Sequence, residues 1–410
     1  GDPPGSAYAL RTGRLSVEIG GVMVRELGPG DLVGELALLT GESRSASVRA
    51  VRDSSLLELP RDAFDDLTMT DPTASRALME QLARWLRDPG STADVRPPQR
   101  ATVISVIALT ESAPVAAVAH RLVAGLAAHH LRVVALTTVD PSGLERAEQD
   151  HDRVVLVGDD DGAHEWRRFC LRQADTVVLV ARADVEVSAR LETPAPARQP
   201  EVVIVGPDPG SGARAAWVAA TDAWDLTVVT GYLEVGLRAM AARLAARSVG
   251  VVLGGGAAGG LAHIGVLREF EQSGIRVDRV AGTSIGAVLG AGYATGLDSE
   301  CLEEAAYSTF VRGRILGDWR LPTEYLIRGG RMQAAADRIY GPDTVIEGLP
   351  RQLWVVSTDL VSRSRQVHRR GRVVDSVLAS SRLPVLLPPM PTDDGRLLVD
   401  GGHGREQHGK

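Results

Sequence analysis

The residues best suited to chemistry form the pentapeptide Gly282-Thr283-Ser284-Ile285-Gly286, which has the pattern G-x-S-x-G. An apolar run typical of a strand, Val277 to Ala281, precedes it, and a run typical of a helix, Ala287 to Ala294, follows it. A sharp strand-to-helix turn exposes a serine hydroxyl above the helix N-terminus, whose partial positive charge favours a developing anion. A glycine-rich turn without chemistry can have the same letters, so the pattern needs support from its context. We predict that Ser284 is a nucleophile.

A second glycine cluster provides that context. Gly254 to Gly260 follows a strand-like run, Val249 to Leu253, and precedes a helical run, Leu261 to Phe270. Without Cβ atoms, such a loop can direct backbone N–H groups at the oxygen of a tetrahedral intermediate, where each donor contributes roughly 3 to 4 kcal/mol. The predicted oxyanion hole comprises Gly254, Gly255, Gly256, Ala257 and Gly259.

The same loop also satisfies G-x-G-x-x-G, the pattern of dinucleotide-binding folds. That interpretation requires an acidic residue at the end of the second strand to bind the ribose. Here the second strand ends in Gly282-Thr283-Ser284, and Asp278 lies at its beginning. The sequence therefore favours the oxyanion interpretation.

A candidate base lies near the C-terminus, where Arg396 to Val399 ends in Asp400-Gly401-Gly402. A carboxylate at a strand end, followed by glycines, can approach a serine closely. A histidine-based triad in the order of the α/β-hydrolases needs a histidine after the acid, and only His403 and His408 remain there, in a polar tail. His263, on the helix after the glycine loop, is expected to be a packing residue.

Three motifs follow one another along the chain: the glycine loop, G-x-S-x-G and D-G-G. Their order and separations resemble those of the patatin-like phospholipases. Ser357 to Leu360, Leu378 to Pro384 and Leu387 to Pro389 are also similar to patatin segments, most of all those of the neuropathy target esterase type. The resemblance implies a Ser284–Asp400 dyad in which Asp400 takes the hydroxyl proton directly. It also implies hydrolysis of acyl esters of lysophospholipids or similar lipids through an acyl-serine, without a metal or other catalytic cofactor.

The N-terminal region alternates strand-like runs with turn signals, which predicts a small β-roll closed by a helix over Pro72 to Arg87. The predicted strands are Arg14 to Ile19, Val22 to Leu27, Ser47 to Val51 and Ser54 to Leu59. Gly34 to Leu39 and Arg44 to Val48 resemble the phosphate-binding cassette of cyclic nucleotide-binding domains. The resemblance implies that Glu35 accepts a ribose hydroxyl and that Arg44 pairs with the phosphate of cAMP or cGMP. The amides of Gly34 and Ala46, with Ser45 between Arg44 and Ala46, would complete the site.

Between these regions, a linker with Pro89, Gly90 and Pro97-Pro98 leads into a segment that reads as buried parallel strands separated by helices such as Pro114 to Ala127. The expected strands are Thr102 to Leu109, Arg132 to Thr137, Arg153 to Val157, Thr176 to Val180 and Val202 to Val205. The segment resembles the MinD and ParA folds without their P-loop, because Thr110 to Pro114 contains neither glycine nor lysine.

We therefore expect a multi-domain chain with an N-terminal β-roll (1–90), a Rossmann-like α/β middle domain (100–247) and an incomplete patatin-like α/β/α domain (248–410). The net charge of −7 argues against a nucleic-acid partner, and two cysteines exclude a disulfide framework. With no apolar run of about 18 residues and no signal peptide, we expect a cytoplasmic protein in peripheral contact with the inner membrane face, acting on a lipid or lysophospholipid.

Two departures from the patatin pattern affect these expectations. Gly259 stands where the family usually has arginine or lysine, and the chain stops soon after Asp400-Gly401-Gly402, so both chain ends look truncated. We expect the strand that holds Asp400 to be an exposed, fraying edge and the activity of this chain to be weak. The alternative is a catalytically impaired regulatory or scaffold protein that retains the fold.

Overall fold

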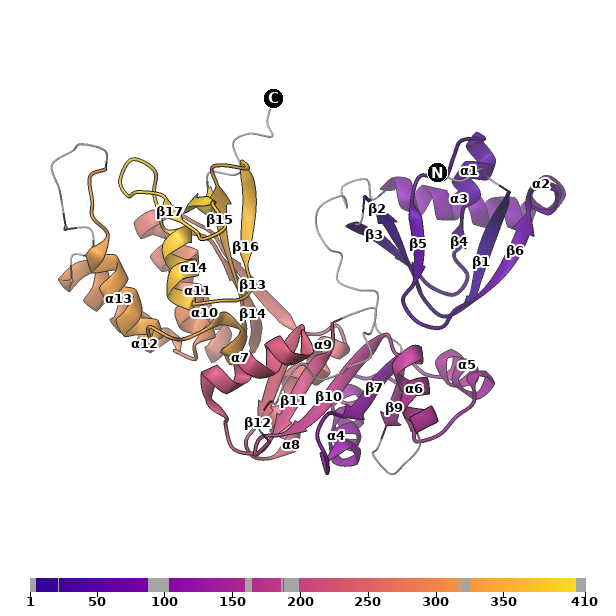
Figure 1. Ribbon diagram of the computed structural model, residues 1–410, viewed down its shortest axis with the longest axis horizontal. Helices are drawn as coiled ribbons and strands as arrows, with labels where there is room; N and C mark the ends of the chain where they lie inside the picture. Colours follow the sequence, from indigo (N-terminus) through magenta and orange to yellow (C-terminus); the bar gives the residue numbers. More distant parts are fainter. Residues whose placement is uncertain are drawn as a thin grey trace. The chain divides into compact units, whose positions relative to one another are not determined.

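The computed structural model describes residues 5–20, 22–87, 103–158, 164–185, 187, 199–313, 315, 317–318 and 325–402. The chain divides into two units. The first contains Gly1–Val185, Arg190–Val205 and Gly231–Ala246, and the second contains Glu186–Ala189, Gly206–Thr230 and Arg247–Lys410. Figure 1 colours them from indigo at the N-terminus to yellow at the C-terminus.

The first unit begins with a roll of two three-stranded antiparallel sheets, ordered β4-β1-β6 and β3-β2-β5 (Figure 1). Its strands are β1 (Ser6–Thr12), β2 (Leu15–Ile19), β3 (Val22–Leu27), β4 (Leu32–Val33), β5 (Ser47–Ala50) and β6 (Ser55–Pro60). Its helices are α1 (Glu35–Thr40), α2 (Arg61–Thr70) and α3 (Pro72–Arg87). The helix predicted over Pro72 to Arg87 and the four predicted strands are confirmed, while β1 and β4 add two strands that the sequence analysis missed.

The rest of the first unit is built on parallel strands that lie in the order β11-β10-β7-β9-β8. They are β7 (Val103–Ala108), β8 (Val133–Leu136), β9 (Arg153–Gly158), β10 (Thr176–Arg182) and β11 (Glu201–Val205). The helices are α4 (Val115–Ala127), α5 (Pro141–Asp150), α6 (His164–Gln173), α8 (Leu233–Gly236) and α9 (Arg238–Leu244). The five predicted strands are confirmed, but β8 is only half-buried, because it lies at an end of the strand order.

Buried charges join the roll to the parallel strands within this unit. The carboxylate of Asp175, at the start of β10, lies 2.8 Å from Nε of Arg14 and 3.3 Å from Nε of Arg52, two arginines of the roll. Asp175 also accepts the N–H of Val103 at 3.0 Å, and Arg52 pairs with Glu148 at 2.6 Å. The side chains of Asp175, Arg14 and Arg52 are at most 5% exposed. Removing one partner from such a cluster leaves an uncompensated charge in the interior.

The second unit contains a six-stranded sheet with the path β13-β14-β15-β18-β17, and β16 also pairs with β15. Its strands are β13 (Val249–Leu253), β14 (Val277–Gly282), β15 (Gln352–Asp359), β16 (Ser364–His368), β17 (Met390–Pro391) and β18 (Leu397–Asp400). Strands β13, β14 and β15 are parallel, whereas β16 and β18 are antiparallel to β15, and β17 is antiparallel to β18.

The strand that carries Asp400 is not the exposed edge that we expected. β18 is hydrogen-bonded to β15 on one side and to β17 on the other, and Leu398, Val399 and Asp400 are buried. β17 has only two residues and includes Pro391, so its sequence has no strand pattern.

The helices of the second unit include α7 (Gly210–Thr221), α10 (Ala262–Gln272), α11 (Ile285–Ala294), α12 (Ser299–Ala306), α13 (Gly330–Tyr340) and α14 (Val373–Ser380). Short elements complete it: β12 (Asp225–Val229), the 3-10 turns η1 (Ala257–Leu261) and η3 (Ile346–Gly348), and the π-helix η2 (Tyr307–Arg312). α11 is buried along most of its length and packs against β14. A Cβ at Gly290 would lie 2.9 Å from Cγ1 of Val280, so small residues allow the helix to lie directly on the strand.

We expect Asp175→Asn to lower the free energy of unfolding of the first unit by about 3 kcal/mol, because two buried guanidinium groups lose their common carboxylate. Chemical denaturation followed by circular dichroism measures this change. The control is Asp184→Asn, which breaks an exposed pair with Arg182 and should change stability little. Equal effects of the two substitutions would contradict a special role for the buried cluster.

Candidate active site and nucleotide pocket

Ser284 occupies the turn between β14 and α11 in a strained conformation. Its backbone has φ 54° and ψ −127°, which a residue with a side chain adopts only when its surroundings impose it. The two glycines of the motif explain how the chain makes this turn. A Cβ at Gly282 would lie 2.4 Å from the carbonyl oxygen of Gly286, and a Cβ at Gly286 would lie 2.1 Å from that of Leu253. Both positions therefore require glycine, as a nucleophile elbow does.

β14 and β18 share one edge of β15. β16 pairs with residues Val355 to Asp359 along one side of β15. Any other strand that pairs with these residues therefore lies on the opposite side of β15. On that side, Val355 pairs with Gly282 at the end of β14, and Ser357 pairs with Asp400 at the end of β18. The two strands run toward each other, so their C-terminal ends meet at Val356. A Cβ at Gly401 would lie 2.3 Å from both Oγ1 of Thr283 and the oxygen of Val356.

The Asp400 side chain is buried beside this junction, with the residue 4% exposed. Its Oδ1 accepts the N–H of Gly402 at 2.8 Å, and its own N–H donates to the carbonyl of Arg382 at 3.0 Å. Among the described residues, Oδ2 of Asp400 has no hydrogen-bond partner. A buried carboxylate oxygen without a partner is costly, which marks it as a candidate base.

Ser380 connects the elbow to the central strand. Its Oγ accepts the N–H of Ser284 at 2.9 Å and donates to the carbonyl of Val356 at 2.6 Å. Thr283 donates to the same carbonyl at 3.2 Å. Ser380 lies in the patatin-like segment Leu378 to Pro384, but no motif in the sequence indicates this role.

The glycine loop lies against the serine. A Cβ at Gly255 would be 3.3 Å from Cβ of Ser284, so the backbone of this loop passes directly beside the nucleophile. Gly259 donates its N–H to the carbonyl of Gly256, which occupies that amide, and Ala257 has φ 47° at the start of η1. Nε2 of His263 lies 3.0 Å from the carbonyl oxygen of Gly254 and so holds the loop.

An apolar cavity of about 260 Å³ opens beside Ser284. Its lining side chains come mostly from α11, α13, α14, η2 and the segment after α14, and include Val288, Phe310, Met332, Ile339 and Leu387. The sequence analysis did not predict this cavity, because its apolar side chains follow the same pattern as any core.

A histidine of β16 contacts the strand that lies between it and β18. Nε2 of His368 is 2.8 Å from Oγ of Ser357, the residue that pairs with Asp400 across the strands. Burial, and then the charge of Arg396, lower the pKa of His368, which favours the neutral imidazole. His403 and His408 lie outside the described residues.

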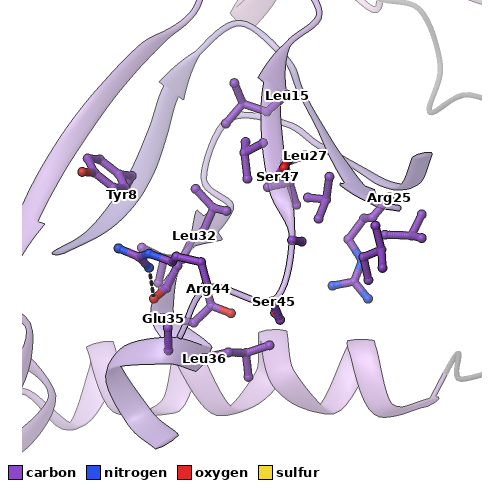
Figure 2. Close-up of a pocket in the computed structure, with 18 of the residues that line it drawn as sticks. Tyr8, Leu15, Arg25, Leu27, Leu32, Glu35, Leu36, Arg44, Ser45 and Ser47 are labelled. Atoms are coloured by element: carbon purple, nitrogen blue, oxygen red, sulfur yellow. Dashed lines mark hydrogen bonds between the residues drawn. The ribbon is translucent and has the colours of Figure 1, made fainter. Parts of the chain in front are cut away.

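The roll encloses a second cavity, of about 1030 Å³, lined by the predicted cassette (Figure 2). Gly34, Glu35, Arg44, Ser45 and Ala46 all line it. The guanidinium of Arg44 donates to the carbonyls of Gly34 at 2.8 Å and Ser6 at 2.5 Å, which fixes it in the cavity wall. Gly34 has φ 85°, and a Cβ there would lie 2.3 Å from Nη1 of Arg44.

Glu35 is the most buried polar residue of this cavity, with 1% exposure. Burial raises the pKa of its carboxyl group, and its own backbone N–H and that of Leu36 partly oppose the shift. Oε2 of Glu35 has no hydrogen-bond partner among the described residues. Such a carboxyl destabilises the fold unless a ligand satisfies it.

Comparisons with known proteins match the two parts of the chain that contain these candidate sites. The family model of the patatin-like phospholipases matches residues 251–404, and that of the cyclic nucleotide-binding domain matches residues 1–71. The fold and the site define a patatin-like phospholipase domain that follows a cyclic nucleotide-binding domain. An NTE family protein of Mycobacterium tuberculosis is 32% identical over 98% of this chain and 69% of its own length. The chain belongs to the NTE family.

More distant relatives extend the comparison. Lysophospholipase NTE1 of Cryptococcus neoformans is 29% identical over 93% of this chain and 29% of its own length. Neuropathy target esterase sws of Drosophila persimilis is 27% identical over 97% of this chain and 33% of its own length. Among solved structures, VipD from Legionella pneumophila is similar over 38% of this chain and 46% of its own, with 14% identity and a TM-score of 0.27. Within the part of the chain that the structure describes, no helix is long and apolar enough to span a membrane.

We expect Ser380→Ala to slow labelling of Ser284 by a fluorophosphonate probe about 10- to 100-fold, because the N–H of the nucleophile loses the acceptor that positions it. The control is Ser376→Ala, a buried serine of the same helix that bonds only the carbonyl of Arg372. If the fluorophosphonate labels both variants equally slowly, the substitutions slow labelling only by destabilising α14, and Ser380 has no positioning role.

Proposed function

We propose that the second unit hydrolyses acyl esters of lysophospholipids through an acyl-Ser284 intermediate. The main support is the strained Ser284 beside an apolar cavity, at the junction where β18 brings a buried carboxylate with an oxygen that no described residue hydrogen-bonds. The names of two relatives, a lysophospholipase and a neuropathy target esterase, also support it. The alternative is a catalytically impaired regulatory or scaffold protein, which the absence of a positive charge at Gly259 favours.

In this mechanism Asp400 takes the proton of the Ser284 hydroxyl while Oγ attacks the ester carbonyl carbon. The backbone amides of Gly254, Gly255, Gly256 and Ala257 stabilise the oxyanion; the amide of Gly259 is already bonded within the loop. The tetrahedral intermediate collapses, and the leaving alcohol takes the proton from Asp400. Water, deprotonated by Asp400, then attacks the acyl-serine; the intermediate collapses to the fatty acid, and Asp400 returns the proton to the leaving Oγ of Ser284.

The cavity supports a substrate with one acyl chain. Its volume of about 260 Å³ is slightly below the range of about 300 to 1,000 Å³ typical of small-molecule sites. Apart from Ser284, the described residues with polar side chains that line it are Thr309, Tyr340 and Ser381, all of which carry hydroxyl groups. An alkyl chain fits these walls, and the polar end of the substrate remains outside them.

We further propose that the roll binds cAMP or cGMP as a regulator. Glu35 would accept the ribose hydroxyl and Arg44 would pair with the phosphate. The ligand would satisfy a carboxyl that burial destabilises in the free roll.

The organisation of the chain completes the proposal. The domains are 1–90, a Rossmann-like segment without a P-loop over 100–247, and the patatin-like domain over 248–410. The protein would work in the cytoplasm, in peripheral contact with the inner membrane face from which it takes its substrate, without a nucleic-acid partner or a metal.

We expect Ser284→Ala to abolish hydrolysis of a lysophospholipid and labelling by a fluorophosphonate, while Asp400→Asn lowers kcat about 100-fold or more with a similar Tm. Fatty-acid release and probe labelling measure these effects. Ser376→Ala should retain most activity. A wild-type chain that neither labels nor hydrolyses would favour the scaffold alternative.

We expect Arg44→Ala to remove most of the heat of cAMP or cGMP binding in calorimetry. Glu35→Gln should also weaken binding, yet raise the Tm at neutral pH. Because the pKa of Glu35 is raised in the folded state, the folded state holds the Glu35 proton more tightly than the unfolded state does. The wild-type chain therefore loses stability as Glu35 deprotonates with rising pH. The glutamine variant has no such proton to lose and keeps this stability. At about pH 4 the gain in Tm should disappear. Unchanged binding in both variants would place the ligand elsewhere.

A further inference from the structure

Arg382 lies between the candidate acid and the wall of the acyl cavity. Its carbonyl accepts the N–H of Asp400 at 3.0 Å, and its neighbours Ser381 and Leu383 line the cavity. Its guanidinium reaches Gly329, just before α13. The position of a Cβ on Gly329 is 2.9 Å from Nη1 of Arg382 and 3.2 Å from Cδ2 of Leu387, a cavity residue. The charged group therefore borders the cavity wall.

No protein group neutralises this guanidinium within the described part of the chain. Nε of Arg382 is buried and has no hydrogen-bond partner, and no carboxylate pairs with the side chain. Burial is the cause that lowers its pKa, with no acidic neighbour to oppose it. Asp318 is the carboxylate at this end of α13, and it accepts the N–H of Arg331 at 3.3 Å.

An unpaired, half-buried guanidinium is costly, and an anion that supplies hydrogen-bond acceptors removes that cost. Its planar donors fit phosphate oxygens well. The described side chains that line the acyl cavity are uncharged, so the cavity suits the apolar part of a substrate. A charged group of the substrate must therefore bind outside the cavity, next to its wall. We infer that Arg382 is the anion subsite of this enzyme and binds the phosphate of a lysophospholipid. The inference rests on the proposed hydrolase function and specifies its substrate.

The binding experiment uses the full chain carrying Ser284→Ala, so that ligands are not consumed. The ligands are octanoylglycerol phosphate and octanoylglycerol, which differ only in the phosphate and are used below their micelle concentrations. We expect the phosphate to improve affinity about 10- to 100-fold in calorimetry, as charge-assisted hydrogen bonds do. Adding Arg382→Gln should remove this advantage and leave octanoylglycerol affinity within about twofold, and Arg382→Lys should restore part of it.

The matched control is Arg328→Gln, which neutralises an exposed arginine just before Gly329 and should leave the preference intact. Equal loss of affinity for both ligands, or a preference that survives Arg382→Gln, would overturn the inference. Competition by inorganic phosphate that depends on Arg382, without a preference between the two lipids, would also overturn it, because the subsite would then serve a free anion. The wild-type chain is assayed in parallel. If the preference for the phosphate-bearing lipid depends on Arg382 but the wild-type chain hydrolyses neither lipid, the proposed hydrolase function is refuted and the anion subsite is supported.

Discussion

The candidate active site depends on a single arrangement of backbone: two strands that meet end to end along the same edge of β15. β14 brings Ser284 to the junction from one direction, and β18 brings Asp400 from the other. The carbonyl of Val356 lies at the meeting point, where it accepts from Thr283 and Ser380 and contacts Gly401 closely. Because strand spacing in a sheet is nearly fixed, this arrangement sets the separation of the backbones of Ser284 and Asp400.

Both candidate sites keep a group that a purely structural protein would avoid. Ser284 holds a strained backbone, and Asp400 and Glu35 each keep a buried carboxylate oxygen that no other described residue hydrogen-bonds. The surrounding structure compensates in different ways. In the second unit, close packing around Gly282, Gly286 and Gly290 fixes the elbow. In the roll, Arg44 is anchored by backbone carbonyls rather than by Glu35, so the acid stays available.

The sequence predicted best what local chemistry determines. The elbow, the glycine loop and most of the predicted strands follow from glycine spacing and apolar runs, which act over a few residues. Strand pairing joins distant segments, and there the expectations were weaker. β18 was expected to be an exposed edge, because the tail after Gly402 has no strand pattern; the strand that pairs with it, β17, lies before it and has only two residues, one of them a proline. The cavity was not predicted, because apolar side chains on α13 and η2 look the same whether they fill a core or line a pocket. The positions of Ser380 and Arg382 depend on the path of the chain after α14, which no motif encodes.

The order of the strands along the chain has a consequence for biosynthesis. The candidate nucleophile follows the second strand of its sheet, while the candidate acid ends the last of those strands to be made. A ribosome therefore releases the elbow well before the strand that supplies its base, and until then β15 offers an empty edge where β18 will bind. Such non-local pairing forms late in folding. In the proposed mechanism the site therefore lacks its base while the chain is being synthesised, and it is complete only when β18 docks on β15.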